Sequence, residues 1–157
     1  MDFNLRPAQR SEAALLSSII RAAKAHWPYT AQQLALWHED LSLTEDQLAS
    51  HPCWVAQAGT KVVGFFLLEK AGVCWALDHL WVLPEFMGQG VGRALLSHAA
   101  MLAAKEGAIR ISIDADPYAE AFYLACGALR IDTVSAPIEG QPERTRPQMT
   151  LQLEAKL

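Results

Sequence analysis

The feature that most constrains this chain is a segment in which an apolar strand runs through a proline and alternating glycines into an amphipathic helix. It reads Leu80-Trp81-Val82-Leu83-Pro84-Glu85-Phe86-Met87-Gly88-Gln89-Gly90-Val91-Gly92-Arg93-Ala94-Leu95-Leu96. Glycine has no Cβ, so the backbone at Gly88, Gly90 and Gly92 can adopt φ > 0 and present its N–H groups to a ligand. The helix that follows adds the positive end of its dipole. The pattern predicts an anion-binding turn suited to a phosphate or pyrophosphate.

Two common nucleotide-binding motifs do not fit this turn. In the pattern G-x-G-x-x-G, the last glycine position holds Arg93 when the pattern starts at Gly88 and Leu95 when it starts at Gly90. The P-loop is excluded because the turn lacks the sequence Gly-Lys-Ser/Thr. A plain tight turn remains the structural alternative to an anion site.

The register of the turn resembles the coenzyme A loop of the GNAT superfamily of N-acetyltransferases. That loop reads Arg/Gln-x-x-Gly-x-Gly/Ala after a strand that ends in Val-x-Pro, and Met87 stands here at its first position. Methionine cannot make the polar side-chain contact of arginine or glutamine, but the backbone amides remain.

A second segment, from Asp114 to Ala128, resembles the family's Asn-x-x-Ala-x-x-x-Tyr-x-x-x-Gly-Phe in the right order and separation. Asp116 stands at the asparagine position and can cap a helix, Tyr123 stands at the tyrosine position, and Gly127 follows where left-handed geometry favours glycine. The resemblance covers roughly residues 3 to 154.

The resemblance implies an acetyl-CoA-dependent transfer of an acetyl group to an amine, with acetyl-CoA as cosubstrate. The residues that it implies for the cosubstrate are Leu80, Trp81, Val82, Met87, Gly88, Gln89, Gly90, Val91, Gly92, Arg93, Asp116 and Tyr123. The oxyanion of the reaction would meet a backbone N–H near Val82. The departing thiolate has an ordinary pKa of about 8.5, so Tyr123 is the candidate general acid. The alternative is that Tyr123 only packs a helix on the sheet.

The attacking amine needs a base or a desolvating pocket, because an amine with a pKa of about 10.4 is about 0.1% neutral at neutral pH. Asp78 and His79 are the candidates. Along an alternating strand Asp78 shares its side with Leu80 and Val82, whereas His79 points to the opposite side. The alternative for Asp78 is a structural, hydrogen-bonded carboxylate, with a water chain removing the proton of the amine. The alternative for His79 is a core histidine whose hydrogen bonds are satisfied.

In this fold the segment after the first helix and the loop before the last strand would select the amine. The residues that we expect to contact it are Trp27, Tyr29, Trp37 and His38. Their aromatic faces offer cation–π attraction. The alternative is that Trp27 and Trp37 are core residues and that the neighbouring Glu39 and Asp40 form a solvated helix end.

Composition narrows the class of protein further. The 157 residues are 52% hydrophobic, which suits one domain over residues 1–157. A net charge of −4 and scattered basic residues argue against nucleic-acid binding. No apolar stretch approaches about 18 residues and no signal peptide is evident, so we expect a cytoplasmic protein without membrane contact. Cys53, Cys74 and Cys126 lack metal-ligand spacing, so we expect reduced thiols and no metal.

The hydrophobic period predicts an α/β fold of single-domain GNAT-like type, with a mixed, mostly antiparallel central sheet of about seven strands flanked by helices. Ser11 is the expected N-cap of the first helix, which runs to about Lys24. A second helix is expected from about Thr30 to Glu39, and a third behind a capping box at Thr44. Further elements are expected as strands over residues 3–6, 54–57, 62–69, 73–83, 109–114, 129–134 and 148–153, and as helices over residues 90–105 and 117–126.

Two other functions stay open at this stage. Met87 and Asp116 depart from the family pattern and favour a non-catalytic acyl-CoA sensor or interaction module on the same fold. A transferase for acyl groups larger than acetyl is the second. The acceptor is equally open between a small-molecule amine and a protein amine, and so is assembly into a homodimer.

Overall fold

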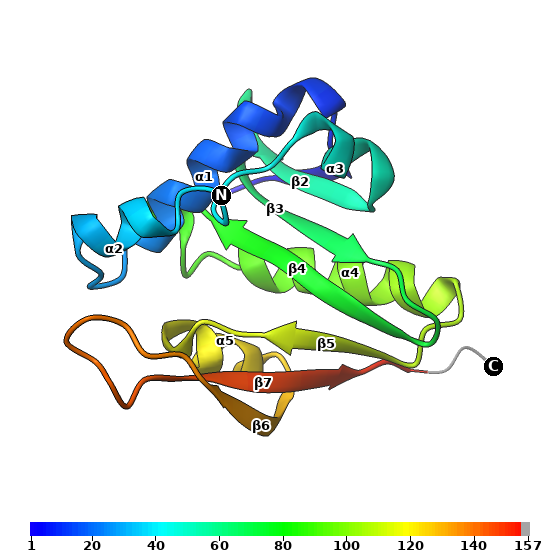
Figure 1. The fold of residues 1–157 in the computed structure, drawn as a ribbon. Coiled ribbons are helices and arrows are strands. Elements are labelled where there is room, and N and C mark those ends of the chain that lie inside the picture. The colour runs from blue at the N-terminus through cyan, green and yellow to red at the C-terminus, as the bar shows by residue number, and fades with distance from the viewer. Residues whose placement is uncertain (155–157) are drawn as a thin grey trace. The chain divides into compact units, whose positions relative to one another are not determined.

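A computed structural model of the chain describes residues 1–154. Among these residues seven strands form one sheet in the order β1-β2-β3-β4-β5-β7-β6 (Figure 1). The elements are β1 (Asn4–Pro7), η1 (Arg10–Glu12), α1 (Ala13–Ala25), α2 (Ala31–Leu36), α3 (Glu45–Ser50), β2 (Cys53–Ala58), β3 (Lys61–Glu69), β4 (Cys74–Val82), η2 (Pro84–Phe86), α4 (Val91–Lys105), β5 (Arg110–Asp114), η3 (Pro117–Ala119), α5 (Glu120–Ala125), β6 (Leu129–Ser135) and β7 (Thr145–Gln152).

Strand direction confirms the predicted mixed sheet. β4 and β5 are parallel and pair from Cys74 and Arg110 to Leu77 and Ile113. The pairs β1–β2, β2–β3, β5–β7 and β6–β7 are antiparallel. A parallel pair needs a crossover connection, and α4 lies in the connection from β4 to β5. The predicted α/β fold with a mostly antiparallel sheet is confirmed.

The chain forms two compact parts, which are described separately. The first part comprises Met1–Leu68 and His79–Ala99, and the second comprises Glu69–Asp78 and the described residues from Ala100 onward. The border between the parts crosses β4 and α4.

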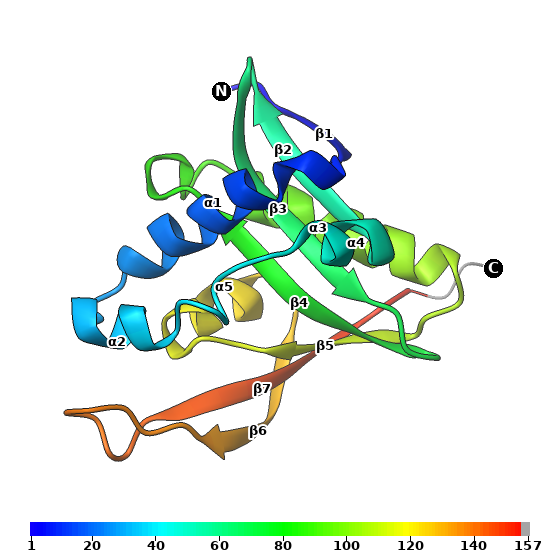
Figure 2. The ribbon, with the colours of Figure 1, turned by 45° about the horizontal axis from the view of Figure 1, so that its top comes forward.

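In the first part, β2 and β3 carry a different helix on each face (Figure 2). Alternate side chains of the strands join the apolar stripe of α1, in a core that includes Leu16, Ile19, Ile20, Val55, Phe65 and Leu67. The intervening side chains face α4: the ring of His98 lies 4.2 Å from that of Trp54 and 6.2 Å from that of Phe66. The period of two in the strands therefore divides the apolar residues between two layers.

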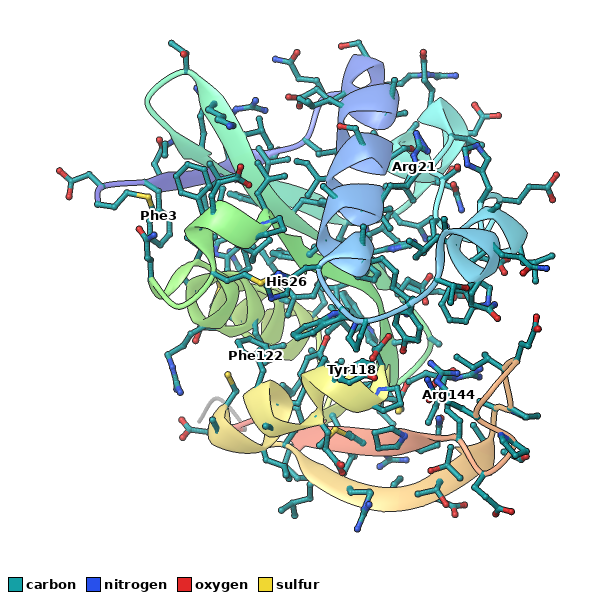
Figure 3. All side chains as sticks on the ribbon, turned by 90° about the vertical axis from the view of Figure 1, so that its left-hand side faces the viewer. Phe3, Arg21, His26, Tyr118, Phe122 and Arg144 are labelled. Atoms are coloured by element: carbon teal, nitrogen blue, oxygen red, sulfur yellow. The ribbon has the colours of Figure 1, made fainter. Side chains whose placement is uncertain are left out.

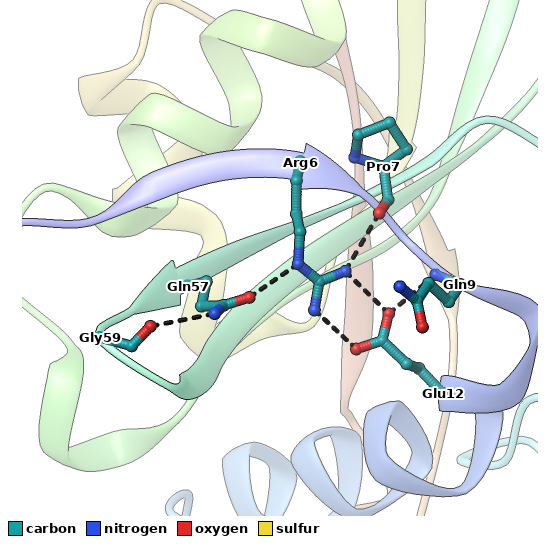
Figure 4. A network of polar contacts seen from close by, with 6 residues as sticks. All are labelled: Arg6, Pro7, Gln9, Glu12, Gln57 and Gly59. Atoms are coloured by element: carbon teal, nitrogen blue, oxygen red, sulfur yellow. Dashed lines mark hydrogen bonds and ion pairs between the residues drawn. The ribbon is translucent and has the colours of Figure 1, made fainter.

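The N-terminal strand is joined to the start of α1 by a polar network (Figure 4). The Arg6 guanidinium donates to both oxygens of Glu12, at 3.0 and 2.8 Å, and its Nε donates to Gln57 Oε1 at 2.7 Å. The Gln9 N–H donates to Glu12 Oε1 at 2.7 Å. The expected N-cap at Ser11 is therefore wrong, because Glu12 reaches back to Gln9 and Ser11 lies inside the 3₁₀ turn η1.

The short helices α2 and α3 begin where the sequence places their caps, but α2 ends earlier than predicted. Thr30 Oγ1 accepts from the Gln33 N–H at 3.0 Å, yet α2 ends at Leu36 rather than near Glu39. Thr44 and Gln47 form the expected capping box of α3. Capping groups act locally, whereas α2 has no buried residue to prolong it.

In the second part, β5, β7 and β6 lie side by side, with α5 next to them (Figure 1). The predicted helix over residues 117–126 is a 3₁₀ turn, η3, followed by the six residues of α5. β7 begins at Thr145, earlier than predicted, and includes Pro147, whose carbonyl accepts from the Ala115 N–H at 3.0 Å. A proline has no N–H to pair, which is why the sequence pattern placed the start of this strand too late.

The helices and the cysteines bear on the class of protein. Within residues 1–154 no helix is long and apolar enough to cross a membrane. Cys53 is buried, Cys74 and Cys126 are partly exposed, and none of the three forms a disulfide within the described residues.

Candidate active site

The glycine turn has the backbone geometry that the sequence predicts. Gly88 and Gly90 have φ of +76° and +87°, a region that residues with a Cβ rarely occupy. Open space lies where a Cβ would be added at either glycine. Conformation rather than crowding therefore requires glycine at these two positions.

The turn is built almost entirely from backbone contacts. Pro84 opens the 3₁₀ turn η2, and the Met87 N–H donates to the Pro84 carbonyl at 3.2 Å. The Ala94 N–H donates to the Gly90 carbonyl at 3.0 Å, so the first turn of α4 starts directly behind Gly90. Gly92 lies inside α4 and is not at positive φ. The N–H groups of a helix's first turn have no partner within the helix, so this turn carries donors and a positive dipole end.

The strand before the turn comes close to β3. A Cβ added at Gly64 would lie 2.8 Å from the Trp81 carbonyl oxygen, so only glycine allows this approach. The Leu83 N–H donates to the Val63 carbonyl at 2.8 Å. Gly64 thus sets the path of β4 at Trp81 and Val82, two residues predicted to contact acetyl-CoA.

His79 is fixed by a neighbour on the same strand. Its Nδ1 accepts from the Trp81 indole N–H at 2.9 Å, which places the proton of the neutral ring on Nε2. Burial lowers the pKa of His79 to about 4. His79 is therefore neutral at neutral pH, with Nδ1 occupied, and these contacts favour the structural alternative over a base at that atom.

The aromatic residues after α1 gather around a lysine that the sequence analysis missed. The Lys24 ammonium lies over the rings of Trp37, Tyr29 and Trp81, at 4.7, 5.0 and 6.0 Å from their centroids. We call these four residues the Lys24 box. The rings of Tyr29 and Trp37 meet edge to face at 5.0 Å. Two of the four predicted acceptor residues are thus brought together.

The other two predicted acceptor residues lie outside the box. Trp27 is half-buried and meets the ring of His26, at the end of α1, with centroids 4.9 Å apart (Figure 3). His38 is exposed, and its carbonyl accepts from Ser42 Oγ at 2.7 Å. Whether Trp27 and His38 contact an acceptor stays a prediction.

Tyr123 and Asp116 lie in the second part of the chain. Tyr123 is buried on α5, and its ring meets that of Phe122, with centroids 5.2 Å apart; Figure 3 labels Phe122. Burial raises the pKa of the Tyr123 phenol well above the usual value, with Cys126 and Asp116 adding to the rise. The phenol is therefore protonated at neutral pH. Asp116 Oδ1 accepts from the Tyr118 N–H at 2.8 Å, which confirms its predicted capping role at the turn η3.

Asp78 ends the stretch of β4 that belongs to the second part, and its side chain is exposed. The predicted site residues thus divide between the two parts: Asp78, Asp116 and Tyr123 lie in one, and the turn, His79 and the acceptor residues lie in the other. Gly127, with φ of +96°, ends α5 as predicted. Within residues 1–154 no three His, Cys, Asp or Glu side chains are grouped as a metal site.

The sequence carries a signal for each of two residues that were not predicted, Lys24 and Gly64. Lys24 follows Leu16 and Ile20 at helical spacing, so it occupies the apolar stripe of α1, where a charged residue requires a specific partner. Gly64 interrupts the apolar run of β3, and an isolated glycine inside a strand indicates a close backbone approach.

Comparison with known proteins agrees with the fold. Residues 16–128 match the model of the acetyltransferase (GNAT) family, which is more than half of the chain. The chain belongs to this family.

Solved structures share the fold at low sequence identity. The PaiA N-acetyltransferase from Thermoplasma acidophilum, in complex with coenzyme A, is 17% identical with a TM-score of 0.81, covering 97% of this chain and 99% of that one. A GCN5-related N-acetyltransferase from Rhodopseudomonas palustris is 24% identical with a TM-score of 0.81, covering 98% and 97%. The ribosomal-protein-S18-alanine N-acetyltransferase from Escherichia coli is 17% identical with a TM-score of 0.75, covering 99% and 96%.

Proposed function

We propose that this protein transfers an acetyl group from acetyl-CoA to a primary amine, by direct attack of the amine in a ternary complex. The observation that carries the proposal is the turn from Pro84 to Gly90 with the first turn of α4 behind it. Positive φ at Gly88 and Gly90, together with the positive end of the helix, suits the pyrophosphate of a coenzyme A ester. Membership of the GNAT family supports this use of the turn.

The proposed reaction has one bond-forming and one bond-breaking step at the thioester carbon. The amine nitrogen bonds to that carbon, its oxygen gains negative charge, and a backbone N–H near Val82 stabilises the charge. The carbon–sulfur bond then breaks and the thiolate takes a proton from Tyr123. A phenol whose pKa is raised by burial keeps that proton until the sulfur leaves.

For the base, Asp78 is the better of the two candidates. Its carboxylate is exposed, whereas Nδ1 of His79 already accepts from Trp81. An exposed carboxylate can accept the amine proton directly or through water. An amine that is already neutral in a desolvated site would need no base before attack, and its nitrogen would lose a proton after the C–N bond forms, to the Tyr123 phenolate or to water. A pH profile of the Asp78→Asn variant separates these routes.

The test is amine-dependent release of free thiol from acetyl-CoA across a broad amine panel, with Tyr123→Phe alongside the wild type. We expect kcat to fall by about 100-fold or more in the variant, the usual share of a general acid. Tyr118→Phe is the matched control, because Tyr118 lies on η3 and is 40% exposed. It should retain most of the activity.

The other outcomes separate the alternatives. Acetyl-CoA binding without thiol release for any amine would favour the sensor. Faster turnover with propionyl-CoA or longer donors would indicate a transferase for larger acyl groups. Absence of acetyl-CoA binding would contradict the role of the turn.

A further inference from the structure

The Lys24 box is an unusual setting for a lysine. Lys24 is only 9% exposed and lies in the last turn of α1, on the side that carries the apolar stripe. Its ammonium lies within 6.0 Å of the rings of Tyr29, Trp37 and Trp81. Cation–π attraction strengthens when the ammonium is removed from water, so the box contributes more than an exposed pair would.

The segment that supplies two of these rings is largely exposed. From His26 to Asp40, all of which the structure describes, no residue is buried. The helix within it, α2, is six residues long and exposes 73% of Leu36. Short helices without a buried face are marginal by themselves. The half-buried Tyr29 and Trp37 therefore provide a large share of the contacts that fix this segment.

The third ring belongs to a fixed part of the protein. Trp81 lies on β4, its indole N–H is held by His79, and its carbonyl faces Gly64 across the close strand contact. Trp81 is also next to Val82, whose backbone N–H is proposed above to meet the oxyanion. The box thus ties the segment after α1 to the strand that presents the thioester in the proposed reaction.

We infer that Lys24 is a positioning residue: its ammonium, held among Tyr29, Trp37 and Trp81, fixes the segment 26–40 against β4 and so sets where the acceptor amine is held. This inference rests on the proposed function, because it assigns the wall of the acceptor site. A small displacement of one reactant from the other costs a large factor in rate. Loss of the cation should therefore impair use of the amine and spare the binding of acetyl-CoA.

The kinetic test compares Lys24→Met, which keeps the length of the side chain without the charge, with Lys24→Arg, which keeps the cation. We expect kcat/KM for the amine to fall at least ten-fold in Lys24→Met, with KM for acetyl-CoA unchanged within two-fold, and to recover in Lys24→Arg. Lys70→Met is the matched control: its ammonium lies 5.4 Å over Trp75, but it is exposed and pairs with Glu106. It should behave as wild type.

Two kinetic results would contradict this role of Lys24. Wild-type kinetics in folded Lys24→Met would overturn the inference, and so would equal losses for both substrates. If Lys24→Met does not fold, Trp37→Leu removes the nearest ring and leaves the lysine, and the same selective loss is expected. A merely structural lysine would lower thermal stability without changing the balance between amine and acetyl-CoA.

Hydrogen exchange separates this inference from the proposed function. Amides of residues 27–37 should exchange at least ten-fold faster in Lys24→Met than in wild type or Lys70→Met, whether or not any amine turns over. If wild type shows no transfer, the proposed function fails and the exchange still tests the box. Unchanged exchange in residues 27–37 would overturn the inference even in an active enzyme.

Discussion

The turn at residues 84–92 and the segment at residues 26–40 are both irregular stretches beside helices, but different forces hold them. In the turn, backbone N–H groups donate to nearby carbonyls, from Met87 to Pro84 and from Ala94 to Gly90. In the segment, aromatic side chains surround the ammonium of Lys24. One site depends on backbone conformation, the other on the identity of a few side chains.

Because of this difference, the two regions tolerate different amino-acid substitutions. A backbone-held turn needs glycine at Gly88 and Gly90, but it permits an uncommon residue such as Met87 beside them. A segment held by side chains can change its shape through one substitution in the Lys24 box. We therefore expect donor binding to survive sequence change more easily than acceptor choice, and the predictions below test that contrast.

The largest expected effect is a loss of folding stability in acid that is caused by protonation of His79. The pKa of His79 is about 4 in the folded protein and about 6.5 when unfolded, so the unfolded state binds the proton first as the pH falls. The folded state should lose up to about 3 kcal/mol between pH 6.5 and pH 4. Denaturant titrations of wild type and His79→Asn across this range measure the loss, which should be much smaller in the variant.

The same titration distinguishes the two regions. A protonated Nδ1 cannot accept from the Trp81 indole, so the Lys24 box should loosen before the turn does. His98→Asn is the comparison, because burial also lowers the pKa of His98 but its ring contacts Trp54 and Phe66. An identical pH dependence in His79→Asn and wild type would refute the assignment to His79.

The next effect concerns the turn alone. In Gly90→Val a β-branched residue would have to adopt a φ of +87°, which costs about 1–3 kcal/mol or shifts the amides away from their ligand. We expect the Kd for acetyl-CoA to rise about ten-fold or more, measured by calorimetry. Gly59→Val is the control, since Gly59 is also at positive φ with open space around it but lies in the β2–β3 turn. Equal losses of affinity in both variants would contradict the backbone account.

Much of the fold was predictable because its signals are local. The period of two in the strands, the capping box at Thr44 and the glycine after α5 each act within a few residues, and each is confirmed. The errors have two other causes. Glu12 accepts from the Gln9 N–H and pairs with Arg6, so the expected cap at Ser11 is wrong. Pro147 continues a strand that its missing N–H seemed to forbid.

The residues of the candidate site divide into those with a local sequence signal and those whose contacts depend on packing. The turn could be predicted because glycine spacing determines local backbone conformation, and the resemblance of Asp116 and Tyr123 to a family motif needed only their order along the chain. The Lys24 box could not, because its rings come from residues separated by up to about a third of the chain. Burial of His79 and its bond to Trp81 likewise depend on packing, which strand alternation alone does not reveal.

The smallest expected effect lies beside the box. Leu36 is 73% exposed on α2, so Leu36→Gln should change the free energy of unfolding by less than about 0.5 kcal/mol and leave the KM for the amine unaltered. Its neighbour Trp37 covers the ammonium of Lys24, so substitution there should raise the exchange of residues 27–37. Thermal denaturation and amide exchange measure both. A large effect of Leu36→Gln would mean that this exposed leucine meets the acceptor or a partner, and that the box is not the main support of the segment.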